Sequence, residues 1–355
     1  IQTLKNAWKV PELKNKILFT IFALLVFRLG SVVPAPFVNT AALGQYLDSM
    51  SGTIFGLLGT MNGTAFSMAA VFALGVQPYI NSSIIIQLLT VAIPALERLA
   101  KEGGEEGRKK IAAITRYATV AIALLQGFGY YSIINSQNLI ELDGMNAIWA
   151  GIVIVTTFVA GSAFVMWLGE QITDKGIGNG ISMILFAGIL SRMPTLINQI
   201  ITGVQQWMIP ITDELVEGLG GAESEAYGTF MASRLHPAIV AVMVVGMLAL
   251  IMFVVYIQNA ERRIPVQYAK RVVGRKMYGG QSTHIPMKVS MAGVMPIIFA
   301  QSIASLPATI CAFMHLDTNS GGFGGSVMRL FDTSKPFYSI LYFLLIVGFS
   351  YFYST

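Results

Sequence analysis

Long apolar runs separated by short polar stretches dominate the pattern of side chains along this chain of 355 residues. Eight of these runs approach or exceed the roughly 20 residues that an α-helix needs to cross a bilayer. They lie at about 17–33, 72–93, 111–134, 147–168, 181–201, 238–257, 289–310 and 338–353. The pattern therefore predicts an all-α fold, a bundle of helices that crosses a membrane many times.

Two of the apolar runs contain the same short interruption. Residues 75–80 read GVQPYI in the second run, and residues 293–298 read GVMPII in the seventh. Proline removes a backbone donor and glycine loosens the turn before it, so each helix is expected to break there. Non-helical backbone at membrane depth is tolerated only beside protein or a water-filled cavity. The repeat thus indicates a functional path, with two unrelated proline kinks as the alternative.

Basic residues collect in alternate connections between the runs. The N-terminus and residues 94–110, 169–180 and 258–288 hold 17 of the 23 Lys and Arg residues, whereas the opposite connections hold only Arg234, Arg329 and Lys335. The positive-inside rule therefore places the N-terminus and the first set of connections in the cytoplasm. The net charge of +5 follows from this topology. It gives no reason to infer nucleic-acid binding.

The two interrupted runs then cross the membrane in opposite directions. Each is the second span of its group, which is typical of an inverted repeat with the functional path at the repeat interface. We expect an N-terminal half at 1–203 and a C-terminal half at 204–355. The first half has five spans and the second has three, so we expect two further spans in the natural gene product.

The amino-acid composition bears on which bonds, metal sites and reactions to expect in this protein. Hydrophobic residues make up 54% of the chain and charged residues 12%, whereas soluble domains are about a quarter charged. One cysteine and three histidines without ligand-like spacing predict neither a disulfide nor a metal site. We expect no covalent chemistry and no cofactor, and therefore a protein that is not an enzyme.

The interiors of the apolar runs contain no Asp, Glu or His. Coupled transporters and pumps need such residues as relays, so this absence argues against a transporter. Aliphatic residues flank the breaks instead, and a ring of them could close a pore by excluding water. The candidate residues are Val76, Ile80, Ile181, Leu185 and Ile298. Ordinary helix packing is the alternative for such a stripe.

Residues 52–67, GTIFGLLGTMNGTAFS, form an unusual connection on the outer side before the second span. The segment is uncharged, rich in glycine and too short to cross a membrane. Its leucine, isoleucine and phenylalanine residues favour burial against protein. We predict a re-entrant segment, and the alternative is a partly ordered surface loop.

The cytoplasmic connection 258–288 carries seven cations, with Tyr268 and Tyr278 between them. Clustered cations could bind anionic lipid headgroups or a partner that carries nucleic acid. The alternative is that these cations serve only to orient the spans in the membrane. Arg275 and Lys276 lie near Gly274 and Gly279, where a hairpin could turn. The other charged connection, KEGGEEGRKK at 101–110, is expected to be solvated.

Several long strings in this chain resemble the SecY family (SecY/Sec61-alpha), which includes the channel subunit of the bacterial Sec protein translocon. The strings are VFRLGSVVPAP (26–36), FALGVQPYINSSIIIQLL (72–89), KEGGEEGRKK (101–110), TRY (115–117), WLGEQITDKGIGNGIS (167–182), RRIPVQYAKR (262–271) and THIPMKVSMAGVMPIIFA (283–300). The resemblance covers essentially the whole chain. It implies an hourglass pore between two inverted halves, with spans 2 and 7 facing each other as a lateral gate.

The resemblance also implies roles for individual residues. The pore ring would consist of the five aliphatic residues named above, with a sixth member on a tenth span. Segment 52–67 would be a plug, and the residues expected to seal the funnel are Ile54, Phe55, Leu57, Leu58 and Met61. Residues expected to line the gate are Ser82, Ser83, Ile86, Gln87, Ser290, Gln301 and Leu306. Residues expected to dock partners are Arg262, Arg263, Lys270, Arg271, Arg275, Lys276 and Tyr278. Ser290 replaces the Asn that is usual in the family, which predicts a weaker polar contact at the gate.

A protein-conducting channel in the bacterial cytoplasmic membrane is the function that the resemblance implies. It would pass unfolded preproteins across the membrane and release hydrophobic segments sideways into lipid, with energy supplied by a partner. The expected partners are the small membrane subunits SecE and SecG, the SecA motor ATPase, the translating ribosome, signal peptides, nascent membrane segments and the lipid bilayer. The alternatives are a solute transporter of inverted-repeat type and a non-conducting SecY-like scaffold.

Overall fold

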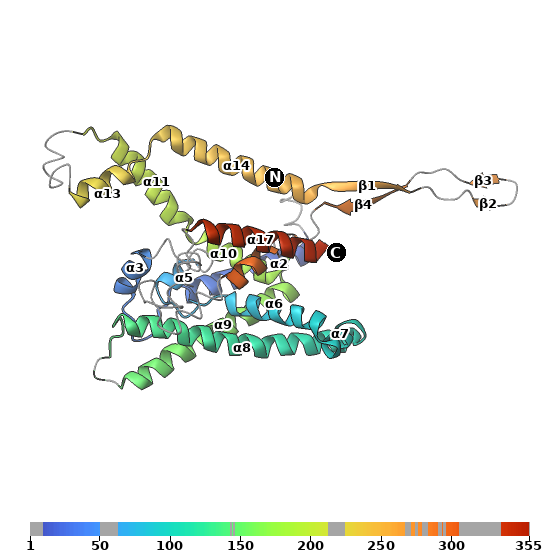
Figure 1. The fold of residues 1–355 in the computed structure, drawn as a ribbon, viewed down its shortest axis with the longest axis horizontal. Coiled ribbons are helices and arrows are strands. Elements are labelled where there is room, and N and C mark those ends of the chain that lie inside the picture. The colour runs from blue at the N-terminus through green and yellow to red at the C-terminus, as the bar shows by residue number, and fades with distance from the viewer. Residues whose placement is uncertain are drawn as a thin grey trace. The chain divides into compact units, whose positions relative to one another are not determined.

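A computed structural model shows a largely helical chain (Figure 1). The structure describes residues 10–49, 63–142, 144, 146–211, 224–266, 271–273, 276–278, 283–289, 293, 296–304 and 335–354. Its helices are α2 (Pro11–Gly30), α3 (Thr40–Ser49), α5 (Thr64–Ser67), α6 (Gln77–Ala92), α7 (Pro94–Lys101), α8 (Gly104–Ser136), α9 (Ala147–Lys175), α10 (Gly180–Leu190), α11 (Met193–Met208), α13 (Glu225–Ser233), α14 (Pro237–Asn259) and α17 (Pro336–Ser354). Its strands are β1 (Glu261–Val266), β2 (Arg271–Val273), β3 (Lys276–Tyr278) and β4 (Thr283–Lys288).

Helices lie where the apolar runs predict them, which confirms the all-α membrane class. Among the described residues, α8, α9, the stretch Gly180–Met208 and α14 are each long and apolar enough to cross a membrane. A fifth candidate is α6 together with α7, although these two helices differ in direction by 102°. In the seventh run the structure describes a helix at residues 296–304.

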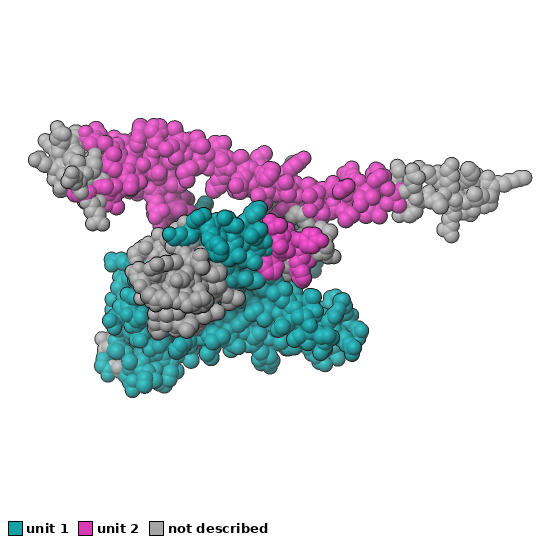
Figure 2. Space-filling view, in the orientation of Figure 1, with its two compact units in different colours: residues 1–193, 298–346 teal, residues 194–297, 347–355 magenta. Residues whose placement is uncertain are grey.

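The chain divides into two compact units (Figure 2). Unit 1 comprises residues 1–193 and 298–346, and unit 2 comprises residues 194–297 and 347–355. The two halves that the inverted repeat predicts, 1–203 and 204–355, stay a prediction. Each unit is a group of residues in contact with one another, and such a division does not test for a repeat.

In unit 1, helices α6, α8 and α9 pack against one another. Their shared core includes Ile134, Ile154 and Phe158, which are fully buried. Small residues allow close approach between membrane helices. For example, a side chain at Gly180 of α10 would meet the Gly169 carbonyl oxygen of α9 at 2.0 Å. The glycines therefore set the spacing of α9 and α10.

Unit 2 contains α14, whose residues are apolar almost throughout and none of which is buried in the structure. After α14, β1 pairs with β4 in an antiparallel ladder from Glu261↔Lys288 to Val266↔Thr283. Strands β2 and β3 pair in turn, with Val273 opposite Lys276. This antiparallel pairing agrees with the hairpin predicted near Arg275 and Lys276, and residues 274 and 275 lie outside the described residues.

The connection at 94–110 is more ordered than expected. Its residues are largely exposed, as predicted, but α7 ends at Lys101 and α8 begins at Gly104. Glu105 and Glu106 lie in the first turn of α8, where negative charge favours a helix. Lys109 forms an ion pair of 3.4 Å with Glu105 one turn earlier. These local interactions explain why KEGGEEGRKK is mostly helical.

Candidate functional site

The repeated motif forms the start of a helix in both places. Gly75 has φ +52° and Gly293 has φ +57°, a left-handed conformation that glycine adopts at little cost. Val76 is the N-cap residue of α6, and Pro78 lies in the first turn, where its missing N–H is no loss. Pro296 is the first described residue of the helix at 296–304. The predicted break is therefore confirmed at Gly75, whereas the second copy is described only at Gly293 and from Pro296 onward.

All five candidate ring residues belong to unit 1. Val76 and Ile80 are buried in the first turn of α6, and Ile181 and Leu185 are half-buried on α10. Ile298 is half-buried in the helix at 296–304. Both α6 and α10 pack against α9, and Ile181 lies directly against Gly169 of that helix. The closing of a pore by these residues stays a prediction.

The gate positions on α6 have different surroundings. The Ser82 hydroxyl is fully buried and donates a 2.8 Å hydrogen bond to the Thr115 carbonyl of α8. Ile86 is buried, Ser83 is half-buried and Gln87 is exposed. Gln301 is half-buried in its helix, while Ser290 and Leu306 lie outside the described residues. Ser82 thus joins α6 to α8, and a gate role for the whole set stays a prediction.

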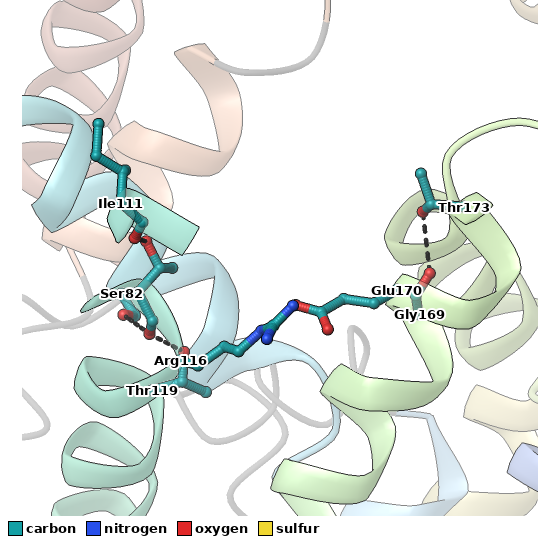
Figure 3. Close-up of polar contacts among 8 residues, drawn as sticks. Ser82, Ile111, Arg116, Thr119, Gly169, Glu170 and Thr173 are labelled. Carbon is teal, nitrogen blue, oxygen red and sulfur yellow. Dashed lines mark hydrogen bonds and ion pairs between the residues drawn. The ribbon is translucent and has the colours of Figure 1, made fainter. Parts of the chain in front are cut away.

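A network of polar contacts close to Ser82 links α6, α8 and α9 (Figure 3). The Arg116 guanidinium of α8 forms an ion pair of 2.9 Å with the Glu170 carboxylate of α9. On α8, the Thr119 hydroxyl donates to the Thr115 carbonyl, which also accepts from Ser82. The network therefore joins α6 to α8 through Ser82, and α8 to α9 through Arg116 and Glu170.

Glu170 is a residue that sequence reasoning missed. The prediction ended the fourth span at residue 168, whereas α9 continues to Lys175 and ends at Gly176. Glu170 therefore extends from a helix rather than from a loop. The available signal was the absence of proline between positions 168 and 176.

The predicted plug is described only at its C-terminal end. Ile54, Phe55, Leu57, Leu58 and Met61 lie outside the described residues. After them, Gly63 adopts φ +67° and α5 begins at Thr64. Side chains of α2 and α8 form hydrogen bonds with this end of the segment. The segment's last residues are buried or half-buried.

Arg28 of α2 donates a 3.2 Å hydrogen bond to the Thr64 hydroxyl. Tyr130 of α8 is buried and donates its hydroxyl to the Phe66 carbonyl. The rings of Phe66 and Tyr130 also stack with their centroids 4.7 Å apart. Tyr130 is a second residue that sequence reasoning missed, because its partner lies 64 positions away.

Five of the seven candidate docking residues lie on the strands of unit 2. Arg262 and Arg263 are exposed neighbours on β1, opposite Met287 and Pro286. Because successive side chains of a strand point to opposite faces, the two guanidinium groups extend from different sides of the ladder. Arg271 pairs with Tyr278 across β2 and β3, and Lys276 begins β3. Lys270 and Arg275 lie outside the described residues.

Among the described residues, no three His, Cys, Asp or Glu side chains gather in a way that could hold a metal ion. The hydrogen bonds and the ion pair described above each join protein groups to one another, mostly from different helices. What this arrangement can do is mechanical: it fixes helix starts and helix spacing.

Comparison with known proteins points to one family. The SecY family model matches residues 70–355. Protein translocase subunit SecY of Streptomyces coelicolor is 42% identical over 357 residues, covering 98% of this chain and 75% of the relative. Protein translocase subunit SecY of Escherichia coli K12 is 40% identical over 358 residues, covering 97% of this chain and 72% of the relative.

Solved structures agree on the fold. A structure described as that of a protein conducting channel matches with a TM-score of 0.57 at 17% identity, covering 95% of this chain and 70% of that one. Sec61 in the canine ribosome-channel complex from the endoplasmic reticulum matches with a TM-score of 0.50 at 17% identity, covering 85% of this chain and 59% of that one. At such identities these matches show the fold alone.

Proposed function

Because the chain belongs to the SecY family, we propose that it forms a protein-conducting channel for unfolded polypeptides. Such a channel passes preproteins across the membrane and releases hydrophobic segments sideways into lipid. The observation that carries this proposal is the 42% identity to a protein translocase subunit over 98% of the chain. The likeness of the fold to a protein-conducting channel agrees with it.

Lateral release follows from partitioning. Each strongly apolar residue of a nascent segment gains up to about 0.6 kcal/mol in a membrane-spanning helix, and each central charge costs about 2.5–3.5 kcal/mol. A channel with an opening to lipid therefore sorts segments by their summed hydrophobicity. In our proposal that opening lies between α6 and the helix at 296–304. The shared helix-start motif at Gly75 and Gly293 supports it.

The proposed constriction consists of Val76, Ile80, Ile181, Leu185 and Ile298. Aliphatic walls close a narrow pore to ions because water leaves it. The packing of both α6 and α10 against α9 supports this proposal. Segment 52–67 is proposed as the plug, and the contacts of Arg28 and Tyr130 with its C-terminal end support that role.

We propose docking of a cytoplasmic partner on the hairpin at 258–288. The exposed Arg262 and Arg263 support this role, because guanidinium groups bind phosphates and carboxylates through paired, charge-assisted hydrogen bonds. A ribosome is the first candidate, since Sec61 occurs in a ribosome-channel complex. SecA, SecE and SecG are further proposed partners, and the N-terminus is proposed to be cytoplasmic.

The docking role has a direct test. Replacement of Arg262 and Arg275 by Glu is expected to weaken ribosome or SecA binding to correctly inserted, purified protein. The loss should shrink as salt rises, because screening already reduces the attraction in the parent. Parent-like affinity at both low and high salt would leave the cations with a role in orientation only.

Transport itself is tested with the full-length gene product and its partners in sealed proteoliposomes. We expect an unfolded preprotein to become protected from external protease, while small solutes do not accumulate. Accumulation of a solute without preprotein import would support the transporter alternative. Absence of both activities, with partners still bound, would support a non-conducting scaffold.

A further inference from the structure

Helix α11 has two chemically different faces. Leu196, Ile197 and Ile201 lie on one side and are about half exposed. The other side carries only uncharged polar groups at helical spacing. These are Thr195, Asn198, Gln199, Thr202 and Gln206. The helix contains no charged residue. In a span, polar side chains are expected to face protein or water rather than lipid.

The polar face of α11 lines an open cavity of about 570 Å³ within unit 2. Its other wall consists of Ala232, Ser233 and Leu235, at the end of α13 and just after it. The two walls approach closely at Gly203, where an added side chain would meet the Ser233 carbonyl oxygen at 2.8 Å. The Leu235 amide donates a 3.0 Å hydrogen bond to the Gly203 carbonyl. Backbone contact therefore fixes the floor of the cavity.

Several polar groups in the cavity are free to bind a ligand. Within the described residues, the side-chain amides of Asn198 and Gln199 and the Thr195 hydroxyl form no hydrogen bond. The side-chain carbonyl oxygen of Gln206 accepts a hydrogen bond from the Ser233 hydroxyl. The side-chain NH₂ group of Gln206 therefore stays available. Each Asn or Gln amide offers two donors and a carbonyl acceptor. The cavity thus presents both donors and acceptors without any charge.

We propose that this face of α11 binds the extended main chain of a polypeptide in transit through the channel. A main chain offers one N–H and one C=O per non-proline residue whatever its sequence, and side-chain amides can pair with both. A surface of this kind suits a channel whose clients differ in sequence. The inference rests on the proposed function and names the ligand of this cavity.

The dimensions agree with this ligand. Thr195 and Gln206 are eleven positions apart on α11, which corresponds to about 16 Å along the helix axis. An extended chain advances about 3.3 Å per residue, so roughly five residues fit along the face. Polar groups recur about every 5.4 Å on the helix, a shorter spacing than the roughly 6.7 Å that separates equivalent groups on one edge of a strand.

Charge separates this proposal from binding to the membrane surface. Helices that lie on anionic lipid usually carry Lys and Arg on their polar face, and α11 has neither. The positive-inside rule assigns the connection after α11 to the outer side. The cavity is therefore expected at the exit side of the channel, where it would contact a chain that has already entered.

Site-specific photo-crosslinking tests the contact. The full-length gene product, reconstituted with its partners, would carry a photoreactive residue at Asn198 or Gln199, or at Ile197 or Ile201 as matched controls on the apolar face. We expect crosslinks from positions 198 and 199 to a preprotein arrested in transit, for two preproteins of unrelated sequence. The control positions should yield mainly lipid adducts. Equal yields from both faces, or adducts at 198 and 199 with lipid or with other parts of the channel alone, would overturn the proposal.

A rate measurement gives a second readout. Asn198→Leu with Gln199→Leu is expected to slow preprotein import about fivefold or more, since one lost hydrogen bond of about 1 kcal/mol corresponds to fivefold. Sideways release of a hydrophobic segment and the thermal stability of the protein should not change. Ile197→Leu should import at the parent rate. Import by the parent with unchanged rates in the double variant would overturn the inference alone, whereas a parent that imports nothing would overturn the proposed function.

Discussion

Helices α9 and α14 are both long and apolar enough to cross a membrane, but their surroundings are opposite. In the most apolar window of α9, 39% of the residues are buried within the structure, whereas 0% are buried in that of α14. The difference lies in where small residues occur. Added side chains at Gly151, Gly161 and Gly169 of α9 would each meet another residue within 3 Å, while Gly246 of α14 has no heavy atom within 4 Å.

The comparison teaches that hydrophobicity and packing are separate signals in a membrane chain. Hydrophobicity predicts that both helices enter the bilayer. Small residues that line up on one face predict which helix touches protein. An apolar helix such as α14, none of whose residues is buried in the structure, presents a surface that is suited to lipid.

The largest effect is expected when a packed glycine is enlarged. In Gly161→Val, the new side chain would begin 2.0 Å from the Val71 carbonyl oxygen, which belongs to the backbone and cannot rotate away. We expect destabilisation at or above the upper end of the roughly 1–3 kcal/mol that overpacking costs. Denaturant unfolding in detergent micelles measures it.

The matched control for this change is Gly246→Val on α14, where the space is open. Its free energy of unfolding should stay within about 0.5 kcal/mol of the parent, as for other surface substitutions. Equal losses at both positions would contradict the role assigned to glycine packing.

A smaller effect is expected when a buried hydroxyl is removed. Tyr130→Phe deletes the hydrogen bond to the Phe66 carbonyl and keeps the ring stack. The Phe66 carbonyl retains a bond from the Ala69 amide, so we expect a loss of about 1 kcal/mol. Tyr256→Phe on α14, where the side chain is 76% exposed, serves as the control. A stability loss in the control as large as that of Tyr130→Phe would show that burial does not decide the cost.

The smallest effect concerns the ion pair of Arg116 and Glu170. Their side chains are 54% and 25% exposed, so a double-mutant cycle is expected to give a coupling of only about 0.2–1 kcal/mol. Exchange of the two residues, Arg116→Glu with Glu170→Arg, should recover most of the loss caused by either single change. If the exchange fares worse than both single variants, the pair is not a simple electrostatic link between α8 and α9.

The sequence pattern predicted much of this fold because its strongest signals are local. Apolar runs of spanning length and a glycine–proline interruption are local properties, and the structure has a helix at each run and a helix start at Gly75. Helix ends were less predictable. Pro94 marks the turn between α6 and α7, but no such residue marks the end of α9 before Gly176.

The candidate site was harder to predict because it depends on contacts between distant positions. The buried bond of Tyr130 joins residues 64 positions apart, and that of Ser82 joins residues 33 apart. Neither partner can be read from local spacing. The polar face of α11 is different, since its period of three to four residues is visible in the sequence once attention moves from charge to amides.

The proposed constriction is the central claim, and conductance across a planar bilayer tests it most directly. The full-length gene product with Ile80→Ser or Ile181→Ser should show a resting ion conductance several-fold above the parent, because polar walls let water and ions enter. Met252→Ser, on the exposed surface of α14, should conduct like the parent. Parent-like conductance in both ring variants, even where they lose stability, would assign Ile80 and Ile181 to ordinary packing and contradict the account.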